Sequence, residues 1–544
     1  MKTVLKKHII IPVVLCLIFI STTAFNNDFF EIAKQIEIFT TLYKEINMNY
    51  VDETNPGELM DTAIKSMLDD LDPYTRFMNE QDVEAARINN TGDYTGIGAR
   101  VKTLKDKLVI IEPYKDYPAD KAGLKAGDEI IKVGNILVSD YKDDAGNLLQ
   151  GASGSTVNVT YKRNNITKTT SIQRAEVEIK AVPYYAMVNE KTGYVVLSKF
   201  NQKASAETSY AVRDLKAQGA EHLILDLRGN PGGLLNEAVN IVNLFVPKGQ
   251  LVVTTKSKVK KYNKQYFTNN TPLDTEMPLV VLIDGSSASA SEIVAGTLQD
   301  LDRAVIVGNR SFGKGLVQRP KQLTYGTQIK ITISRYYTPS GRCIQSLDYW
   351  NRNENGEAVR VKQENYNAFK TKNGRNVFDG GGIFPDVSIN QIENSTITKA
   401  ILESNLIFDF ATAYYYKHPK VDMGAFKLTE SDFKDFKDYL GKHNFSFTTQ
   451  TEKALYKAYE KSVEEQLNDA IKQSYETLIS NLKASKKEAI NEHKPFILQA
   501  LTEEIVKRYA YREGLYDYYK TNDEHIRQSA QILGNTMTYM DYLR

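Results

Sequence analysis

A run of small hydroxyl residues is the part of the sequence best suited to covalent chemistry. The string Ser286-Ser287-Ala288-Ser289-Ala290-Ser291-Glu292 lies between residues 278–284, whose apolar run predicts a buried strand, and a helical pattern over residues 291–301. Free amides and the helix dipole at such a helix start favour developing negative charge. The run predicts a serine nucleophile, although capping alone would explain any single serine.

A serine nucleophile needs a base, and a lysine is the candidate that the sequence offers. The six histidines are His8, His222, His418, His443, His493 and His525. His222 alone falls in the central α/β part, ahead of a predicted strand and opposite the edge where α/β sites usually form. Lys314 lies between glycines in Phe312-Gly313-Lys314-Gly315, where other groups can approach closely. A lysine must lose its proton to act as a base, which burial favours.

The same lysine belongs to a string that only partly matches a phosphate-binding loop. In Gly308-Asn309-Arg310-Ser311-Phe312-Gly313-Lys314-Gly315 no Ser or Thr follows the lysine to hold Mg²⁺. The alternation of Ile329, Ile331 and Ile333 then predicts a strand and not the required helix. The sequence also lacks the His-Glu-x-x-His zinc motif and the Gly-x-Ser-x-Gly elbow. We therefore expect no nucleotide, metal or other cofactor.

A third string follows another buried strand. Asp226-Leu227-Arg228-Gly229-Asn230-Pro231-Gly232-Gly233 stands between the predicted strand 223–227 and the predicted helix 234–245. Its composition is that of a strand-to-helix turn. Paired glycines before a helix can also present backbone amides to an oxyanion.

In this order, the three strings resemble the tail-specific, or carboxy-terminal-processing, serine protease family. The resemblance implies a Ser-Lys dyad in which Ser289 is the nucleophile and Lys314 is the general base. It also implies that Gln318 orients the lysine. The oxyanion hole would use the amide of Ala290 and that of one of two neighbouring glycines, Gly232 or Gly233.

The segment before the α/β part resembles a PDZ domain. Short alternating runs at 107–111 and 156–161 predict a β-rich module, and Tyr94-Thr95-Gly96-Ile97-Gly98 is similar to a PDZ carboxylate-binding loop. The resemblance implies that a peptide C-terminus is held while the peptide adds to the sheet edge. The loop residues implied are Thr95, Gly96, Ile97 and Gly98. The alternative is a β-module that only packs against the core.

The elements that must position these residues indicate a multidomain fold. Strands predicted at 194–197, 223–227, 279–283 and 304–307 alternate with helices at 204–217, 234–245 and 291–301. In the helical N-terminal segment, Ile32, Ile36 and Leu42 are spaced for one buried face, and the C-terminal region is helical with mixed charge. The predicted parts are a signal peptide (1–24), a helical segment (25–90), a PDZ domain (91–181), an α/β protease core (182–390) and a helical C-terminal region (391–544).

The net charge indicates which partners to expect, and the N-terminal residues indicate where the protein is located. The 69 basic and 67 acidic residues among 544 give a net charge of +2, so no attraction to nucleic acid is predicted. Lys2, Lys6 and Lys7, the apolar residues 9–20 and the small residues 21–24 follow the pattern of a secretory signal. We expect export to a periplasm or cell envelope. Membrane anchoring would follow only if this signal were not cleaved.

The predicted function is that of an exported serine endopeptidase. It would recognise unstructured C-terminal tails of proteins through its PDZ domain and cleave them through an acyl-enzyme. The alternative is a non-catalytic PDZ-type binding protein with a degenerate protease core. By analogy with the family, the terminal helices would form a homo-oligomer or a wall that confines the substrate. Buttressing of a single protomer explains their mixed charge equally well.

Overall fold

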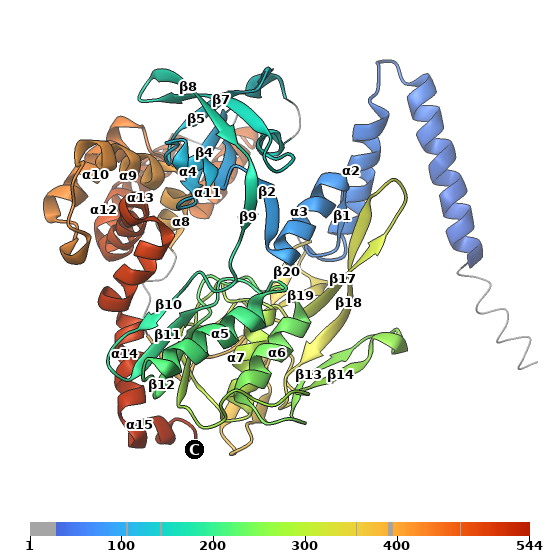
Figure 1. The fold of residues 1–544 in the computed structure, drawn as a ribbon. Helices are drawn as coiled ribbons and strands as arrows, with labels where there is room; N and C mark the ends of the chain where they lie inside the picture. Colours follow the sequence, from blue (N-terminus) through green and yellow to red (C-terminus); the bar gives the residue numbers. More distant parts are fainter. Residues whose placement is uncertain (1–28, 105–106, 142–143, 355, 390–394, 468) are drawn as a thin grey trace, which may run out of the picture. The chain divides into compact units, whose positions relative to one another are not determined.

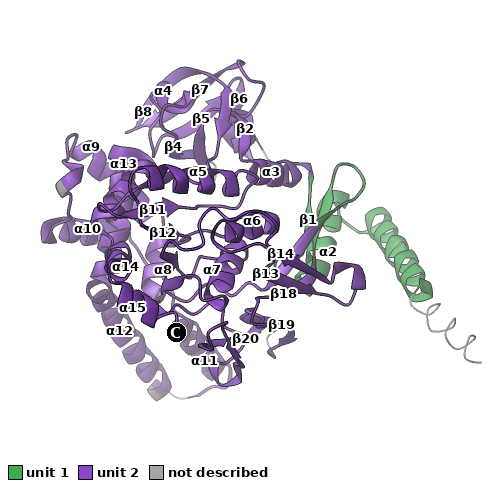
Figure 2. Ribbon diagram, turned by 60° about the horizontal axis from the view of Figure 1, so that its bottom comes forward, with its two compact units in different colours: residues 1–79, 320–332 green, residues 80–319, 333–544 purple. Residues whose placement is uncertain are grey.

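The computed structural model describes residues 29–104, 107–141, 144–354, 356–389, 395–467 and 469–544. The signal peptide predicted at 1–24 lies outside the described residues. Contacts divide the chain into two compact units (Figure 2), residues 1–79 with 320–332 and residues 80–319 with 333–544. Within the described ranges, no helix combines the length and the apolar character needed to cross a membrane.

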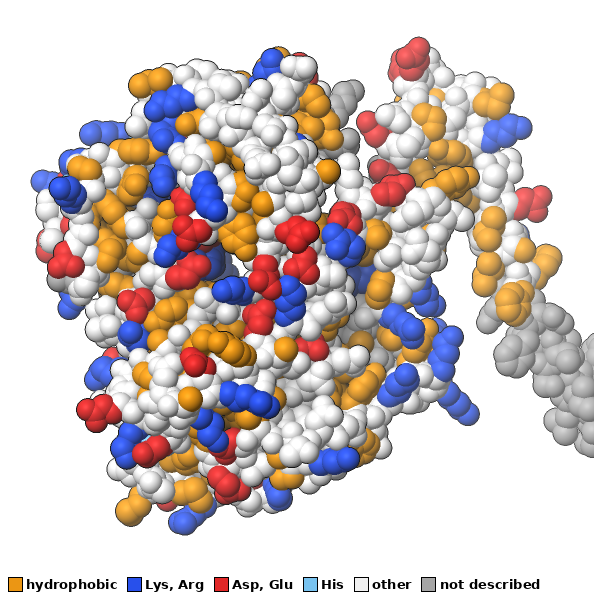
Figure 3. Space-filling view, viewed as in Figure 1, with side chains coloured by type: hydrophobic (Ala, Val, Ile, Leu, Met, Phe, Trp, Pro, Cys, Tyr) orange, Lys and Arg blue, Asp and Glu red, His pale blue; other side chains and the backbone are white. Residues whose placement is uncertain are grey.

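The first unit is mainly helical. Residues 29–49 form one helix, and α2 (Pro56–Asp69) begins where Asn55 Oδ1 accepts the Gly57 amide at 3.1 Å. β1 (Arg76–Met78) pairs antiparallel with Gln328–Lys330 of β18. The prediction of a buried face on the first helix is wrong. Ile32, Ile36 and Leu42 are all exposed, because the described residues leave this apolar face uncovered, and hydrophobic side chains are visible on its surface in Figure 3.

The second unit contains the predicted β-rich module (Figure 1). Its core includes Leu108, Ile110 and Val159, and the order β3-β4-β5-β7-β8 leaves β3 with a free edge in this sheet. The elements of the module and of the helix before it are α3 (Glu80–Thr91), β2 (Asp93–Gly96), β3 (Ala99–Leu104), β4 (Lys107–Pro113), α4 (Pro118–Lys121), β5 (Glu129–Val133), β6 (Ile136–Leu137), η1 (Val138–Asp140), η2 (Ala145–Leu149), β7 (Thr156–Arg163), β8 (Ile166–Gln173) and β9 (Ala175–Glu178).

The α/β core is built on a six-stranded sheet of order β10-β11-β12-β15-β16-β23. All neighbours from β11 to β23 are parallel, and β10 is an antiparallel edge. The loops after β12 and β15 therefore leave the same sheet edge, where α/β sites form. The elements are β10 (Tyr184–Met187), β11 (Thr192–Val196), α5 (Ala204–Ala217), β12 (His222–Asp226), α6 (Leu235–Phe245), β15 (Leu279–Ile283), α7 (Ala290–Asp300), β16 (Val305–Gly308) and β23 (Val387–Ser388).

Further strands follow α6 and β16. β13 pairs with both β14 and the end of β18, so the strand expected around Ile329–Ile333 is present. These elements are β13 (Leu251–Lys256), η3 (Lys260–Tyr262), β14 (Lys264–Phe267), β17 (Leu316–Gln322), β18 (Gln328–Tyr337), β19 (Leu347–Arg352), β20 (Ala358–Arg360), η4 (Gln363–Asn365), β21 (Ala368–Lys370) and β22 (Asn376–Phe378).

The C-terminal region is helical, as predicted. Phe410, Phe436 and Leu501 share one core, whereas Ile526 and Tyr539 pack with the central sheet. The helices are α8 (Thr396–Glu403), α9 (Leu406–Lys417), η5 (Met423–Ala425), α10 (Glu430–Lys442), α11 (Gln450–Glu464), α12 (Asp469–Glu492), α13 (Lys494–Asn522), α14 (Glu524–Gly534) and α15 (Thr536–Asp541).

Candidate active site

Ser289 stands out within the hydroxyl run by its backbone conformation. It directly precedes α7 and has φ of +56°, a conformation that costs a non-glycine residue free energy and that is concentrated at functional sites. Ser287 and Ser291 are fully buried, and their hydroxyls donate to the carbonyl oxygens of Leu227 (2.8 Å) and Asn230 (2.9 Å). Ser289 is only partly buried and Ser286 is exposed, whereas the side chains of Ser287 and Ser291 are committed to these hydrogen bonds.

One buried carboxylate joins the turn that carries Ser289 (the serine turn) to the loop that carries Lys314 (residues 309–315, the lysine loop). Glu292 Oε2 accepts the amides of Ser289 (2.8 Å) and Lys314 (2.9 Å), and Oε1 accepts the Ser311 hydroxyl and the Gly313 amide, both at 2.6 Å. Burial raises the pKa of Glu292 to about 7, against the opposing effect of these four hydrogen bonds. Sequence reasoning did not single out Glu292, although the Ser-x-x-Glu spacing of a capping box was a usable signal.

The loop that carries Lys314 is held on both sides. Ahead of the lysine, the Phe312 amide donates to the Ser287 carbonyl oxygen at 3.1 Å. After it, the Gly315 amide donates to Gln345 Oε1 at 2.7 Å. Lys314 is half-buried on this loop, and Gln318 is half-buried on β17, which begins two residues later.

Tyr336, at the end of β18, contacts both the lysine loop and the serine. Its amide donates to the Gly315 carbonyl oxygen at 2.9 Å, and its hydroxyl donates to the Ser289 carbonyl oxygen at 3.2 Å. The aromatic side chain is almost fully buried. The structure thus brings the backbones of Ser289 and Lys314 together, as the predicted dyad requires.

The turn of residues 227–233 that follows β12, called the glycine turn below, lies directly against Ser289. A Cβ at Gly232 would fall 2.9 Å from both the Ala290 nitrogen and Ser289 Cβ, and φ there is +95°. The Gly232 amide donates to Asn230 Oδ1 at 2.9 Å. Among the described residues, the amides of Gly233 and Ala290 donate to no protein acceptor. The predicted oxyanion residues are therefore adjacent, and Gly233 has the available amide.

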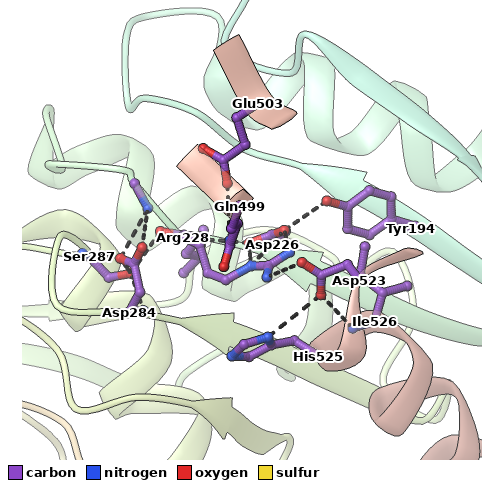
Figure 4. Close-up of polar contacts among 12 residues, drawn as sticks. Tyr194, Asp226, Arg228, Asp284, Ser287, Gln499, Glu503, Asp523, His525 and Ile526 are labelled. Atoms are coloured by element: carbon purple, nitrogen blue, oxygen red, sulfur yellow. Dashed lines mark hydrogen bonds and ion pairs between the residues drawn. The ribbon is translucent and has the colours of Figure 1, made fainter. Parts of the chain in front are cut away.

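The same turn carries a buried ion pair to the C-terminal helices (Figure 4). Arg228 Nη2 lies 2.7 Å from Asp226 Oδ2, and Arg228 Nη1 lies 2.8 Å from Asp523 Oδ2. The Tyr194 hydroxyl donates to Asp226 at 2.7 Å. Burial alone would raise the pKa of Asp523, but the charge and hydrogen bonds of Arg228 outweigh it and hold that pKa below its usual value. Nothing in the sequence near Asp523 indicated this role.

His222 begins β12, at the end of the strand opposite the glycine turn. Four other histidines, His418, His443, His493 and His525, lie in the C-terminal helical region, and His8 is outside the described residues. His525 lies against Asp523, with Nδ1 3.6 Å from Oδ1. Among the described residues, no hydrogen bond or ion pair joins a histidine to Ser289.

The predicted carboxylate-binding residues lie where β2 turns into β3. Thr95 and Gly96 belong to β2 and pair with β9, whereas Ile97 and Gly98 form the turn itself. Gly98 has φ of +71°, and a Cβ there would lie 2.4 Å from Tyr117 Cβ. A groove of about 240 Å³ runs beside β3, lined among others by Ile97, Ala99, Val101 and Leu149. The groove is also lined by polar residues, Asp144 and Asn147 among them. A free strand edge and an adjoining groove with apolar side chains are the elements of strand addition.

Three family models match consecutive parts of the chain. A PDZ domain model matches residues 95–173, the peptidase family S41 model residues 191–349, and a model described as the C-terminal helical domain of probable PDZ-proteases residues 397–533. These matches confirm the predicted fold class.

Individual relatives point to the same family of proteases. A carboxy-terminal-processing protease of Bartonella bacilliformis is 34% identical over 321 residues, covering 58% of this chain and 73% of the relative. A probable CtpA-like serine protease of Staphylococcus haemolyticus is 33% identical over 313 residues, covering 57% of this chain and 63% of the relative, less than two thirds of its length. The solved structure titled photosystem II D1 C-terminal processing protease is 27% identical, with 65% of this chain and 92% of that chain covered and a TM-score of 0.36.

Proposed function

The chain belongs to the carboxy-terminal-processing protease family, within peptidase family S41, and we propose that it is a serine endopeptidase acting on protein C-terminal tails. The tail's free carboxylate binds at the turn of Ile97 and Gly98, and the tail adds as a strand along β3. The adjoining segment then reaches Ser289. The free edge of β3 and the groove beside it support this mode of capture.

Cleavage in this proposal proceeds through an acyl-enzyme. Ser289 Oγ attacks the scissile carbonyl carbon while neutral Lys314 takes the hydroxyl proton, and Gln318 orients the lysine. The amides of Ala290 and Gly233 stabilise the oxyanion of the tetrahedral intermediate. The C–N bond breaks as Lys314 returns the proton to the leaving amine. Water, deprotonated by the same lysine, then attacks the ester carbon of the acyl-enzyme. The C–Oγ bond breaks, Lys314 returns the proton to Ser289 Oγ, and the new carboxylic acid leaves.

The observation that carries the proposal is the shared acceptor between the two halves of the dyad. The amides of Ser289 and Lys314 donate to the same oxygen of Glu292, so their nitrogens lie within two hydrogen-bond lengths of each other. The two residues are 25 positions apart in the sequence and come from different loops. Such convergence, with the serine backbone at positive φ, favours a catalytic pair over helix capping alone.

The test uses a soluble protein that ends in an unstructured apolar tail, prepared with a free or an amidated C-terminus. We expect mass spectrometry to show cleavage by the wild type, and cleavage at least about 10³-fold slower with Ser289→Ala or Lys314→Arg. Amidation should reduce cleavage by weakening capture. Equal cleavage by either variant would refute the dyad. A wild type that binds the tail without cleaving it would instead support the non-catalytic binding protein.

We further propose that the protein is exported and that it forms a homo-oligomer through its terminal helices. The signal-like residues 1–24 support export, and the exposed apolar side chains of residues 29–49 support self-association. N-terminal sequencing of the mature protein from the cell envelope tests the first proposal. A monomeric mass in solution, measured by light scattering, would contradict the second.

A further inference from the structure

Most of the glycine turn is held by residues of the α/β core itself. The Gly229 amide donates to Asp284 at 3.0 Å, and Asn230 Nδ2 donates to the Leu197 carbonyl oxygen at 2.7 Å. The Asn230 carbonyl oxygen accepts the Ser291 hydroxyl at 2.9 Å. These contacts hold the turn from Gly229 onward against α7 and against the residues that directly follow β11 and β15.

Arg228 anchors the beginning of the turn in a different way. Only 13% of its side chain is exposed, and Asp226 accepts hydrogen bonds from Nε and Nη2, so one edge of the planar group is occupied by the residue that ends its own strand. The remaining corner, Nη1, meets Asp523, 295 residues later in the chain. The bidentate contact with Asp226 sets the plane of the guanidinium, and Asp523 adds a second carboxylate that holds its outer corner.

Asp523 is itself held firmly. Figure 4 shows its two oxygens divided between Arg228 and the start of α14. Oδ2 accepts from Arg228, and Oδ1 accepts the Ile526 amide at 3.0 Å, which makes Asp523 the N-cap of α14. Ile526 is completely buried in the cluster that the C-terminal helices form with the central sheet. The carboxylate therefore reaches the turn on a packed helix, with only 9% of its side chain exposed.

We propose that Asp523 is a positioning residue for the reaction, through which the C-terminal helical region sets the oxyanion-hole turn by way of Arg228. The inference rests on the proposed peptidase function. Asp523 touches no reacting atom in this proposal. It fixes the guanidinium of Arg228, which fixes the backbone leading to Gly232 and Gly233. Displacement of a catalytic group by about 1 Å can cost on the order of 100-fold in rate.

Two substitutions separate the ion pair from the helix cap. Asp523→Asn keeps the size and the capping oxygen but loses the charge. Asp523→Ser also caps well, but it is too short to reach Arg228. The matched control is Asn535→Ala, because Asn535 caps α15 by accepting the Thr538 amide at 3.1 Å and contacts no part of the turn. All three substitutions change an N-cap residue in the same region, and only Asn535→Ala removes the cap itself.

The measurements are kcat and KM on the tail-bearing protein, with hydrogen exchange of the amides in residues 227–233. We expect kcat to fall about tenfold for Asp523→Asn and about 100-fold for Asp523→Ser, with KM within about twofold of the wild type. Exchange in the turn should be faster in both. Asn535→Ala should keep the wild-type kcat and the wild-type exchange in the turn.

Wild-type kcat and exchange in both Asp523 variants would overturn the inference, and so would a fall in kcat no larger than that of Asn535→Ala. Failure of the proposed function looks different, because the wild type would then cleave no substrate. In that case unchanged exchange in the turn of the Asp523 variants would still refute the positioning role, and faster exchange would support it.

Discussion

The same local motif begins α7 in the catalytic core and α11 in the C-terminal region, with different consequences. At α11, the Thr449 amide donates to Glu452 Oε2 at 2.7 Å, and the Glu452 amide donates to Thr449 Oγ1 at 3.1 Å. At α7, the Ser289 amide makes the equivalent bond to Glu292 at 2.8 Å. Thr449 has an ordinary extended backbone with φ of −79°, whereas Ser289 is at +56°.

The surroundings of the two carboxylates explain the difference. Glu452 keeps 12% of its side chain exposed. The effect of burial on its pKa is outweighed by hydrogen bonds from Thr449 and Lys486, which hold that pKa below the usual value. Glu292 is completely buried, and its pKa is raised to about 7. A capping box thus organises only its own helix unless tertiary structure brings other amides to the same carboxylate, as the lysine loop does at α7.

Removal of each carboxylate provides the strongest contrast. Glu292→Gln should lower kcat by about 10² to 10³-fold, because an amide group cannot accept all four donors that now fix Ser289 and Lys314. Glu452→Gln, the matched control, should leave kcat unchanged and cost about 1 kcal/mol of stability. Kinetics on a tail-bearing protein and thermal unfolding measure both. Comparable kcat values for the two variants would show that the α7 box, like that of α11, only starts a helix.

Filling the space beside Ser289 should have the next largest effect. Gly232→Ala places a Cβ 2.6 Å from the Ala288 carbonyl oxygen, so we expect kcat to fall by about 100-fold as the turn is displaced from the serine. Gly249→Ala is the control, because Gly249 has a similar φ of +90° with nothing within 4 Å. It should cost about 1 kcal/mol of stability and leave kcat unchanged. A wild-type kcat in Gly232→Ala would place the turn outside the reacting site.

Acid should affect the α7 carboxylate first. The ionised form of Glu292 accepts all four donors, so kcat should fall up to about tenfold per pH unit below pH 7 as the carboxylate is protonated. The contribution of Glu292 to folding stability changes with pH in the direction opposite to kcat. Because the folded-state pKa is raised, this group's contribution is fully present below about pH 4.5 and is lost as pH rises through about 7. The lowered pKa of Glu452 gives a contribution that is present above about pH 4.5 and lost in acid.

The pH dependence is checked by kcat and melting temperature from pH 5 to pH 8, each compared with the matching glutamine variant. The residual activity of Glu292→Gln should lack the part of the acid limb that belongs to this carboxylate. An acid limb that is identical in wild type and Glu292→Gln would assign it to another group.

The smallest effect is expected from the partner of Glu452. Lys486→Met removes an ion pair in which Nζ lies 3.0 Å from Glu452 Oε1, with 20% of the lysine side chain exposed. The expected loss is at most about 1 kcal/mol in urea unfolding, because partly exposed pairs are screened by solvent. Cleavage rates should not change. A fall in kcat would mean that the α11 region, too, is coupled to the active site.

The catalytic strings were recognisable because each works over a short stretch of chain. A hydroxyl run before a helix, a lysine between glycines and paired glycines after a strand are visible as composition and spacing. The apolar runs similarly predicted the four parallel strands β11, β12, β15 and β16 to within a few residues, but neither β10 nor the short β23. The apolar spacing of residues 29–49 predicted the helix correctly. It could not show whether any partner covers the apolar face.

The sequence by itself determined the kinds of element, the family resemblance and the residues able to react, because these follow from local pattern. Tertiary structure alone decided that Ser287 and Ser291 are buried while Ser289 stays partly exposed. It also decided that one buried carboxylate receives amides from both Ser289 and Lys314, and that Asp523 meets Arg228. Such contacts join residues up to 295 positions apart. Only the packing of the whole chain brings them together, because the sequence around one partner does not indicate which residue the other will be.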